Sequence, residues 1–205
     1  MESNIEERKK EMKKLMFIAM MMVAMSASAQ REVGTLTLQP KIGISSPIMY
    51  MDDKNVDNQS MTGFLGGAEL EYQMKKWFSL SAGVMYSQEG GKNKIKDLNV
   101  TEKVNLGYIN IPVMANFYVW KGLALKIGLQ PGFKVHEKFD VPNNAALSTS
   151  KYGFGNKADN FDLKLPIGIS YDFGNVVLEL RSAPGLTKPL KDKDYINGCA
   201  QLTVG

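Results

Sequence analysis

The stretch FDLKLPIGIS, residues 161–170, alternates between two kinds of side chain. Its even-numbered positions are charged, small or polar, and its odd-numbered positions are Phe161, Leu163, Leu165, Ile167 and Ile169. Alternation of this kind is the period of a β-strand, because successive side chains of a strand point to opposite faces. The fold therefore depends on what the apolar face covers, a protein core or lipid.

Similar alternating segments recur along the chain and predict eight strands. They lie at 35–45, 64–73, 78–87, 108–118, 123–135, 161–170, 176–182 and 199–205. The connections alternate in length, with long ones at roughly 46–61, 88–103, 137–158 and 183–197 and short ones at roughly 74–77, 119–122 and 173–175. Bacterial transmembrane barrels have an even number of antiparallel strands, short periplasmic turns and longer outer loops. We therefore expect an all-β fold, an eight-stranded antiparallel up-and-down transmembrane β-barrel with four extracellular loops.

The polar face of these segments indicates the inside of a narrow barrel. It is rich in Gly, Ser, Thr, Asn and Gln, and its charges are of both signs: Lys41, Glu69, Glu71, Lys126, Lys134, Asp162, Lys164, Glu179 and Arg181. An eight-stranded barrel has an interior just wide enough for side chains to fill. We therefore expect the polar face inside and the apolar face against lipid. The alternative is a soluble, periplasmic lipocalin-like carrier with the apolar face lining a ligand cavity.

Aromatic residues gather at the predicted strand ends, as in the two aromatic girdles of membrane barrels. Those near the short turns are Trp77, Phe78, Tyr118, Trp120, Tyr171 and Phe173. Those near the long loops are Tyr86, Tyr108, Phe133 and Phe161. Proline lacks a ladder donor, so bulges are expected at the prolines inside predicted strands, Pro40, Pro112, Pro131 and Pro166.

The N-terminal segment has the pattern of a secretory signal peptide. Lys13 and Lys14 precede eleven apolar residues at 15–25, and a small-x-small site follows at 27–29. We expect residues 1–29 to be a signal peptide cleaved before Gln30 and residues 30–205 to form the outer-membrane barrel domain. Met12 is expected to be an ordinary start. Eleven apolar residues are too few to span a bilayer as a helix.

Composition excludes several other classes of protein. The chain has 205 residues, is 44% hydrophobic and carries a formal net charge of +4. Its one cysteine, Cys199, excludes an internal disulfide and a cysteine-cluster metal site. The charge balance is mild and no basic stripe is interleaved with aromatics, so nucleic acid is not an expected partner.

Three stretches resemble a known family. The "SASAQ" of the predicted cleavage site, "YINIPVMANFY" at 108–118 and "FDLKLPIGISYDFGNVVLELRSAPGLT" at 161–187 are similar to the porin-like outer-membrane β-barrel family that includes PorT. The resemblance covers about residues 34–205 and implies a small outer-membrane barrel. PorT is associated with protein secretion, but no residue of this chain carries that role over.

Candidate catalytic and metal-binding residues give weak signals. A lipid A deacylase would need a His–Ser pair, for which His136 and Ser148 or Ser150 are available. Asp53, Asn55 and Asp57 match the first ligands of a calcium loop, but Asn58 stands where glycine is needed and Phe64 where a carboxylate is needed.

We therefore expect no catalytic, cofactor-binding or metal-binding residues and no cofactor. The predicted function is a non-enzymatic outer-membrane barrel with a side-chain-filled lumen, whose outer loops bind a partner or support the envelope. Expected partners are outer-membrane lipid and lipopolysaccharide, the barrel-assembly machinery during insertion, and an unidentified envelope protein. The alternatives are a PorT-like component of an envelope secretion system, an exported enzyme, and the lipocalin-like carrier.

Overall fold

The computed structural model describes residues 31–50, 56–95, 100–140, 158–187 and 196–205. Its antiparallel strands are β1 (Leu36–Tyr50), β2 (Val56–Gln59), β3 (Gly63–Lys75), β4 (Phe78–Ile95), β5 (Val100–Asn110), β6 (Val113–Trp120), β7 (Leu123–Asp140), β8 (Phe161–Lys164), β9 (Ile167–Asp172), β10 (Val177–Pro184) and β11 (Ile196–Val204). Within the described residues, no helix has the length and apolar character needed to cross a membrane.

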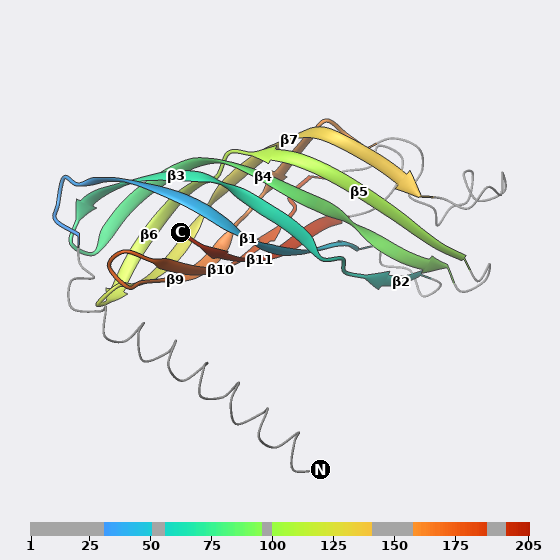
Figure 1. Ribbon diagram of the computed structural model, residues 1–205. Helices are drawn as coiled ribbons and strands as arrows, with labels where there is room; N and C mark the ends of the chain where they lie inside the picture. The colour runs from blue at the N-terminus through green and yellow to red at the C-terminus, as the bar shows by residue number, and fades with distance from the viewer. Residues whose placement is uncertain (1–30, 51–55, 96–99, 141–157, 188–195) are drawn as a thin grey trace, which may run out of the picture.

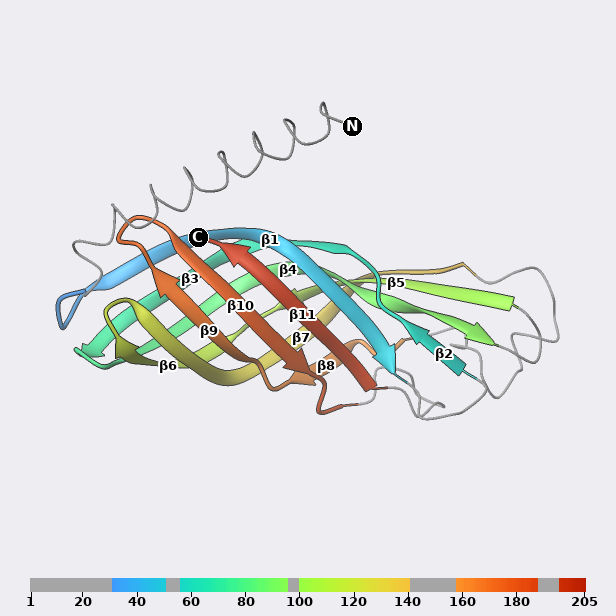
Figure 2. The same ribbon diagram turned by 90° about the horizontal axis from the view of Figure 1, so that it is seen from below.

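The described strand segments combine into eight barrel strands. β2 and β3 both pair with β4. β5 and β6 both pair with β4 on one side and with β7 on the other. β8 and β9 both pair with β7. The ring closes where β1 pairs with β11, from Ile42 opposite Val204 to Tyr50 opposite Ile196. Figures 1 and 2 show the strands wrapped at a common tilt around one axis. The predicted eight-stranded antiparallel barrel is confirmed.

The two faces of the wall answer the question posed by residues 161–170. Apolar side chains lie outside, as Leu38 and Ile42 show with exposed fractions of 64% and 65%, whereas the intervening Lys41 is 1% exposed. In the opening stretch, Phe161 is exposed and Asp162 is buried. An apolar exterior around a charged interior suits lipid and is the reverse of what a lipocalin-like carrier requires.

The aromatic girdles are present, with two corrections to their membership. Trp77, Phe78 and Phe117 contact one another at the short-turn end, and Phe133 packs edge-on against Phe161 toward the other end. However, Tyr108 and Tyr118 were wrongly assigned to the girdles. Tyr108 is fully buried, and Tyr118 donates a hydrogen bond to Glu71 in the lumen. Each tyrosine lies two residues from an inward-facing asparagine of the same strand, Asn110 or Asn116, and therefore points to the same face.

Two of the four prolines interrupt strands without opening the wall. Pro112 lies between β5 and β6, and Pro166 lies between β8 and β9. Their carbonyl groups still accept hydrogen bonds across the wall, from the amides of Gly83 and Gly128 at 3.0 Å. Pro40 and Pro131 remain inside β1 and β7 and pair with Ala68 and Leu163. The pairing register is the same on both sides of each of the four prolines, so the bulges expected at these positions are not found.

The strands extend further toward the long-loop end than predicted. β4 continues to Ile95 and β5 begins at Val100, so most of the stretch 88–103 is a paired hairpin instead of a loop. The short turns lie together at the opposite end of the barrel, as predicted (Figure 1). They include Gly122 and Gly174, whose positive φ angles of 81° and 96° favour glycine.

Candidate functional site

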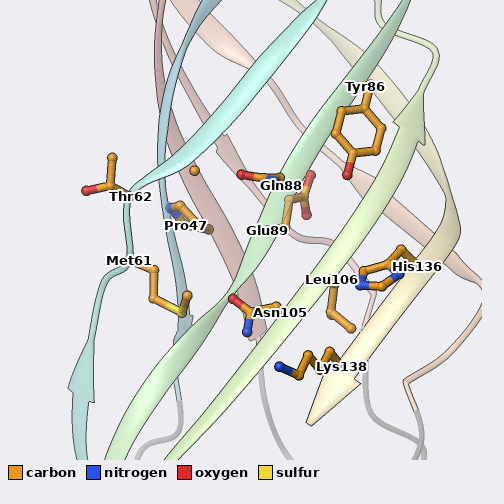
Figure 3. A pocket seen from close by; sticks show the side chains of 11 residues that line it. Pro47, Met61, Thr62, Tyr86, Gln88, Glu89, Asn105, Leu106, His136 and Lys138 are labelled. Atoms are coloured by element: carbon orange, nitrogen blue, oxygen red, sulfur yellow. The ribbon is translucent and has the colours of Figure 1, made fainter. Parts of the chain in front are cut away.

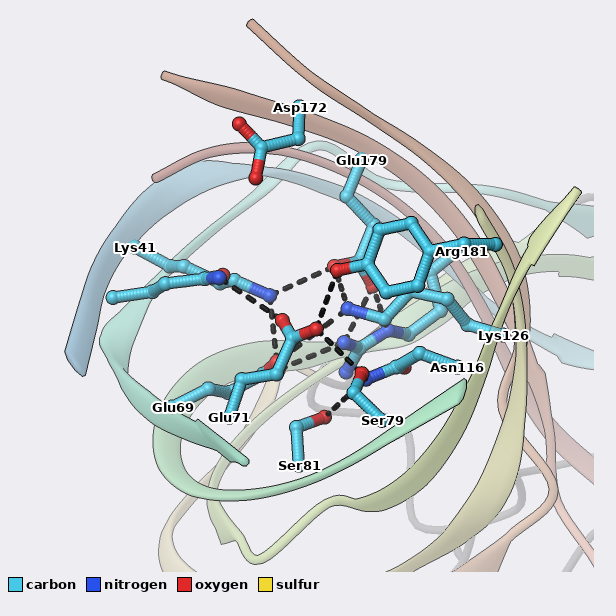
Figure 4. Close-up of polar contacts among 12 residues, drawn as sticks. Lys41, Glu69, Glu71, Ser79, Ser81, Asn116, Lys126, Asp172, Glu179 and Arg181 are labelled. Atoms are coloured by element: carbon cyan, nitrogen blue, oxygen red, sulfur yellow. Dashed lines mark hydrogen bonds and ion pairs between the residues drawn. The ribbon is translucent and has the colours of Figure 1, made fainter. Parts of the chain in front are cut away.

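The lumen near the short turns holds a closed network of charges, which we call the turn-end cluster (Figure 4). Its members are Lys41, Glu69, Lys126, Glu179 and Arg181. Lys41 Nζ lies 2.6 Å from Glu69 Oε2 and 2.7 Å from Glu179 Oε2. Arg181 Nη2 lies 2.8 Å from Glu69 Oε1 and 2.5 Å from Glu179 Oε1, and Lys126 Nζ lies 3.0 Å from Glu179 Oε2. The two carboxylates thus bridge three cations, and the five residues come from four strands, β1, β3, β7 and β10.

Further polar contacts continue this cluster toward the turn end of the barrel. Glu71 accepts hydrogen bonds from Tyr118 Oη and Ser79 Oγ, both at 2.5 Å. Arg31 Nη2 lies 2.9 Å from Asp172 Oδ2. With these residues included, the cations are Arg31, Lys41, Lys126 and Arg181, and the carboxylates are Glu69, Glu71, Asp172 and Glu179. This part of the lumen is formally neutral, which lowers the free-energy cost of burying its charges.

In the middle of the lumen, large side chains lie opposite glycines of the neighbouring strand. Met85 pairs with Gly67, and Met114 pairs with Gly128. A Cβ atom on Gly128 would lie 2.0 Å from the Val113 carbonyl oxygen and 2.7 Å from Met114 Sδ. Glycine therefore makes the room that the methionines occupy.

We expect Gly128→Ala to destabilise the barrel by about 1–3 kcal/mol, because the added methyl group overpacks a filled interior. The measurement is urea unfolding of the refolded protein in detergent micelles. Gly198→Ala is the matched control, since its Cβ would meet only Ile48 Cγ2 at an ordinary 3.8 Å. An equal, small effect at both positions would contradict the tight packing at Gly128.

A second charged group, the outer cluster, lies nearer the long loops. Lys164 Nζ is 2.7 Å from Glu89 Oε2 and 3.1 Å from Asp162 Oδ2. Asn197 donates from Nδ2 to the same two carboxylates, at 2.7 and 2.9 Å. The Lys164 ammonium also lies over the ring of Tyr108, 4.9 Å from its centroid. All five side chains are buried, so this group forms a second layer of paired polar side chains across the lumen.

Buried side chains also occupy the lumen between and beyond the two clusters, within the described residues. Between the two clusters lie Leu65, Met85, Met114 and Gln130, all buried, and beyond the outer cluster Val104 and Leu106 are buried as well. Among the described residues, the ionised groups of these two clusters lie within contact distance of one another.

The His–Ser candidate is only partly placed by the structure. His136 lies on β7 with an exposed side chain, and Ser148 and Ser150 lie outside the described residues. His136 contributes to a pocket of about 240 Å³ on the long-loop half of the wall (Figure 3). Among the described residues that line this pocket there is no serine.

The calcium-loop candidate is placed only at its third position. Asp53 and Asn55 lie outside the described residues, and Asp57 is exposed on β2, where its carboxylate accepts a hydrogen bond from Gln59 Nε2 at 3.2 Å. Within the described ranges, no group of three or more His, Cys, Asp or Glu residues is arranged to hold a metal ion.

Sequence reasoning missed a set of lysines on the outer wall around the pocket. Lys92, Lys103 and Lys138 lie on the outer ends of β4, β5 and β7, in the two stretches 88–103 and 137–158 that were predicted to be loops. The alternation of residues 100–110 could have indicated that Lys103 continues the outward face of Ile109. The position of Lys138 could not be read from alternation, because a β-bulge precedes it.

The closed ring, the apolar exterior and the packed polar lumen define an integral β-barrel protein of the bacterial outer membrane. The family model named outer membrane protein beta-barrel domain matches residues 28–190, and the chain belongs to this family. The protein is therefore located in the cell outer membrane.

Solved structures agree on the fold. Ail, the attachment invasion locus protein of Yersinia pestis, solved in complex with the heparin analogue sucrose octasulfate, is 13% identical with a TM-score of 0.52. The comparison covers 85% of this chain and 98% of Ail. Neisserial surface protein A is 14% identical with a TM-score of 0.55, over 83% of this chain and 97% of that one. No curated protein matches the chain.

Proposed function

We propose that the protein is a closed, non-enzymatic barrel that works through its outward-facing end. The observation that carries this proposal is the turn-end cluster, which together with Arg31, Glu71 and Asp172 is formally neutral and whose buried charges pair with one another inside the lumen. A hydrated pore or a catalytic site would need ionised groups that face water or a substrate. The barrel instead serves as a rigid support for what extends beyond the membrane.

The outer end has the form of a platform. β4, β5 and β7 continue together beyond the apolar, lipid-facing part of the wall, and β2 pairs with the outer part of β4 (Figure 2). We propose that this platform and the outer loops bind a partner at the envelope surface. Outer-membrane lipid and lipopolysaccharide surround the wall, the barrel-assembly machinery acts during insertion, and an envelope protein is the further proposed partner.

A folding assay in detergent tests the membrane part of the proposal. The chain from Gln30 should give a compact band on a gel that shifts only after boiling. This band should form in detergent or lipid and be absent without them, because the apolar exterior needs a lipid-like phase. Folding to a stable monomer in plain buffer would overturn the proposal.

Conductance tests the closed lumen. In a planar lipid bilayer, the refolded protein should give no steady channel, while a general porin studied in parallel conducts. Reproducible steps of conductance that appear with folded protein and vanish with boiled protein would contradict a filled barrel.

Within the family, we propose a PorT-like relationship, supported by the stretches at 108–118 and 161–187. A component of a secretion system should copurify with other envelope proteins after mild crosslinking, and its deletion should leave exported proteins inside the cell. Unchanged export in the deletion strain would remove the secretion role and leave the barrel assignment intact.

A further inference from the structure

A β-bulge in β7 turns two basic side chains onto the outer wall. Pairing with β5 shifts register near Gly107, which lies opposite His136, so that Val135 is skipped. Before the bulge, Lys134 points inward, and its ammonium donates to the carbonyl of Ala158 at 2.6 Å. After the bulge, His136 and Lys138 share the outward face and both are exposed. Bulges commonly re-aim side chains in this way.

Three more lysines lie on the same outward face. Lys92 of β4 is directly opposite Lys103 of β5, and Lys94 follows on β4, opposite Asp57 of β2. Like charges directly opposite one another destabilise a strand pair. The Lys92–Lys103 pair is therefore unfavourable by itself, and an anion between the two ammonium groups would relieve it, while on its other side Lys103 lies opposite Asp140 of β7. We call the set Lys92, Lys94, Lys103, His136 and Lys138 the basic rim.

The basic rim lies at the level of lipid headgroups. The outward side chains just below it are apolar and exposed, among them Val84, Phe133 and Val135. Along β4, β5 and β7, the outer face of the wall therefore changes within a few residues from apolar to basic. At the boundary of the hydrocarbon layer, a cationic surface meets the phosphates of the outer leaflet.

A pocket of about 240 Å³ opens beside the rim. It lies where the ladder on one side of β4 is interrupted, between the pairs Leu65–Ser87 and Gln59–Lys92. The polar residues that line it are Thr62, Tyr86, Gln88, Glu89, Asn105, His136 and Lys138, and the carboxylate of Glu89 is paired with Lys164. Figure 3 shows the Tyr86 hydroxyl turned toward the level of His136, and Lys138 directed back toward Asn105. Hydroxyl and amide groups beside cations are suited to a phosphorylated sugar.

We propose that the basic rim and this pocket bind the phosphorylated sugar headgroup of a glycolipid in the outer leaflet. Lys92, Lys103 and Lys138 hold the phosphates, while Tyr86 and Asn105 meet the sugar hydroxyls. The inference rests on the proposed function, because it requires the long-loop end to face outward from the cell.

The test uses the refolded chain in neutral detergent micelles and two probes, lipid A and enzymatically dephosphorylated lipid A. The variant Lys92→Gln, Lys103→Gln, Lys138→Gln should bind lipid A at least about tenfold more weakly than the wild type, because each lysine near an anionic surface adds attraction. The matched control is Lys75→Gln, Lys76→Gln, Lys121→Gln, which removes three exposed lysines from the turn end. The control should bind as the wild type does, and dephosphorylated lipid A should bind the wild type as weakly as lipid A binds the rim variant.

Several results would overturn the inference. Equal loss in the rim and turn-end variants would indicate nonspecific attraction, and equal binding of both probes would exclude phosphate recognition. Competition by inorganic phosphate at matched phosphate concentration would assign the rim to the free ion and not to a lipid. Each variant is first checked for the heat-modifiable band. A wild type that lacks the band contradicts the proposed function itself, whereas a folded wild type that ignores lipid A contradicts only this inference.

Discussion

Replacing Glu179 by glutamine should destabilise the folded barrel by about 3–5 kcal/mol, because removal of one partner leaves buried charges uncompensated. Glu179 contacts Lys41, Lys126 and Arg181, and it is fully buried. The substitution keeps the size of the side chain and removes its charge. Urea unfolding in detergent micelles measures the effect, and the fluorescence of Trp77 and Trp120 at the short-turn end reports it.

The control for this prediction is Glu137→Gln, which breaks a more exposed pair with Lys134. The Glu137 side chain is 34% exposed, and such pairs contribute about 1 kcal/mol or less. Adding Lys41→Gln to Glu179→Gln restores charge balance in the cluster, so the double variant should lose less than the sum of the single losses. Strictly additive losses, or an effect of Glu179→Gln no larger than the control, would show that the network is not coupled.

Lysine at position 129 should cost about 2–4 kcal/mol, because the side chain would lie in the middle of the lipid-facing band. Leu129 is 51% exposed on the outer face of β7, between the aromatic residues of the two girdles. The measurement is again urea unfolding, with lipid vesicles in place of micelles so that the hydrocarbon layer has its full thickness.

The same strand supplies a matched control near the interface. Val135→Lys places the same charge on the same face, where Val135 is 58% exposed, and should cost about 0–1 kcal/mol at this depth. A difference between the two variants measures the depth of each residue in lipid. Equal costs, or a Leu129→Lys variant that becomes soluble without detergent, would contradict the position of the band.

Which side chains of each strand point outward could be predicted from sequence, because this depends only on the alternation of residues within the strand. Leu178 and Glu179 are adjacent, and their opposite preferences for lipid and for a paired interior decide the orientation of β10. Tyr108 and Tyr118 were misplaced because this alternation was not applied to them. They were assigned by their nearness to a strand end, although their parity with Asn110 and Asn116 already indicated the lumen.

Features that depend on a partner strand could not be predicted. The stretch around Lys92 and Lys103 is rich in glycine and charge, and its local composition is that of a loop. It forms paired strands because β2 and β7 flank it and continue the ladder on both sides. The bulge at Val135 is likewise a property of the β5–β7 pair, so the outward position of His136 and Lys138 has no signal within β7 itself.

The turn-end cluster also constrains how the chain can enter the membrane. Lys41 on β1 and Glu179 on β10 are 138 residues apart, and the strand between them in the ring is β11, which closes it. A half-formed sheet would turn its charged side toward hydrocarbon, where each ion is costly. The outward apolar side chains could partition one strand at a time, but the inward charges tolerate the bilayer only in a sealed ring. For this sequence we therefore expect insertion and closure of the sheet to be coupled, with the turn-end charges pairing as β1 meets β11.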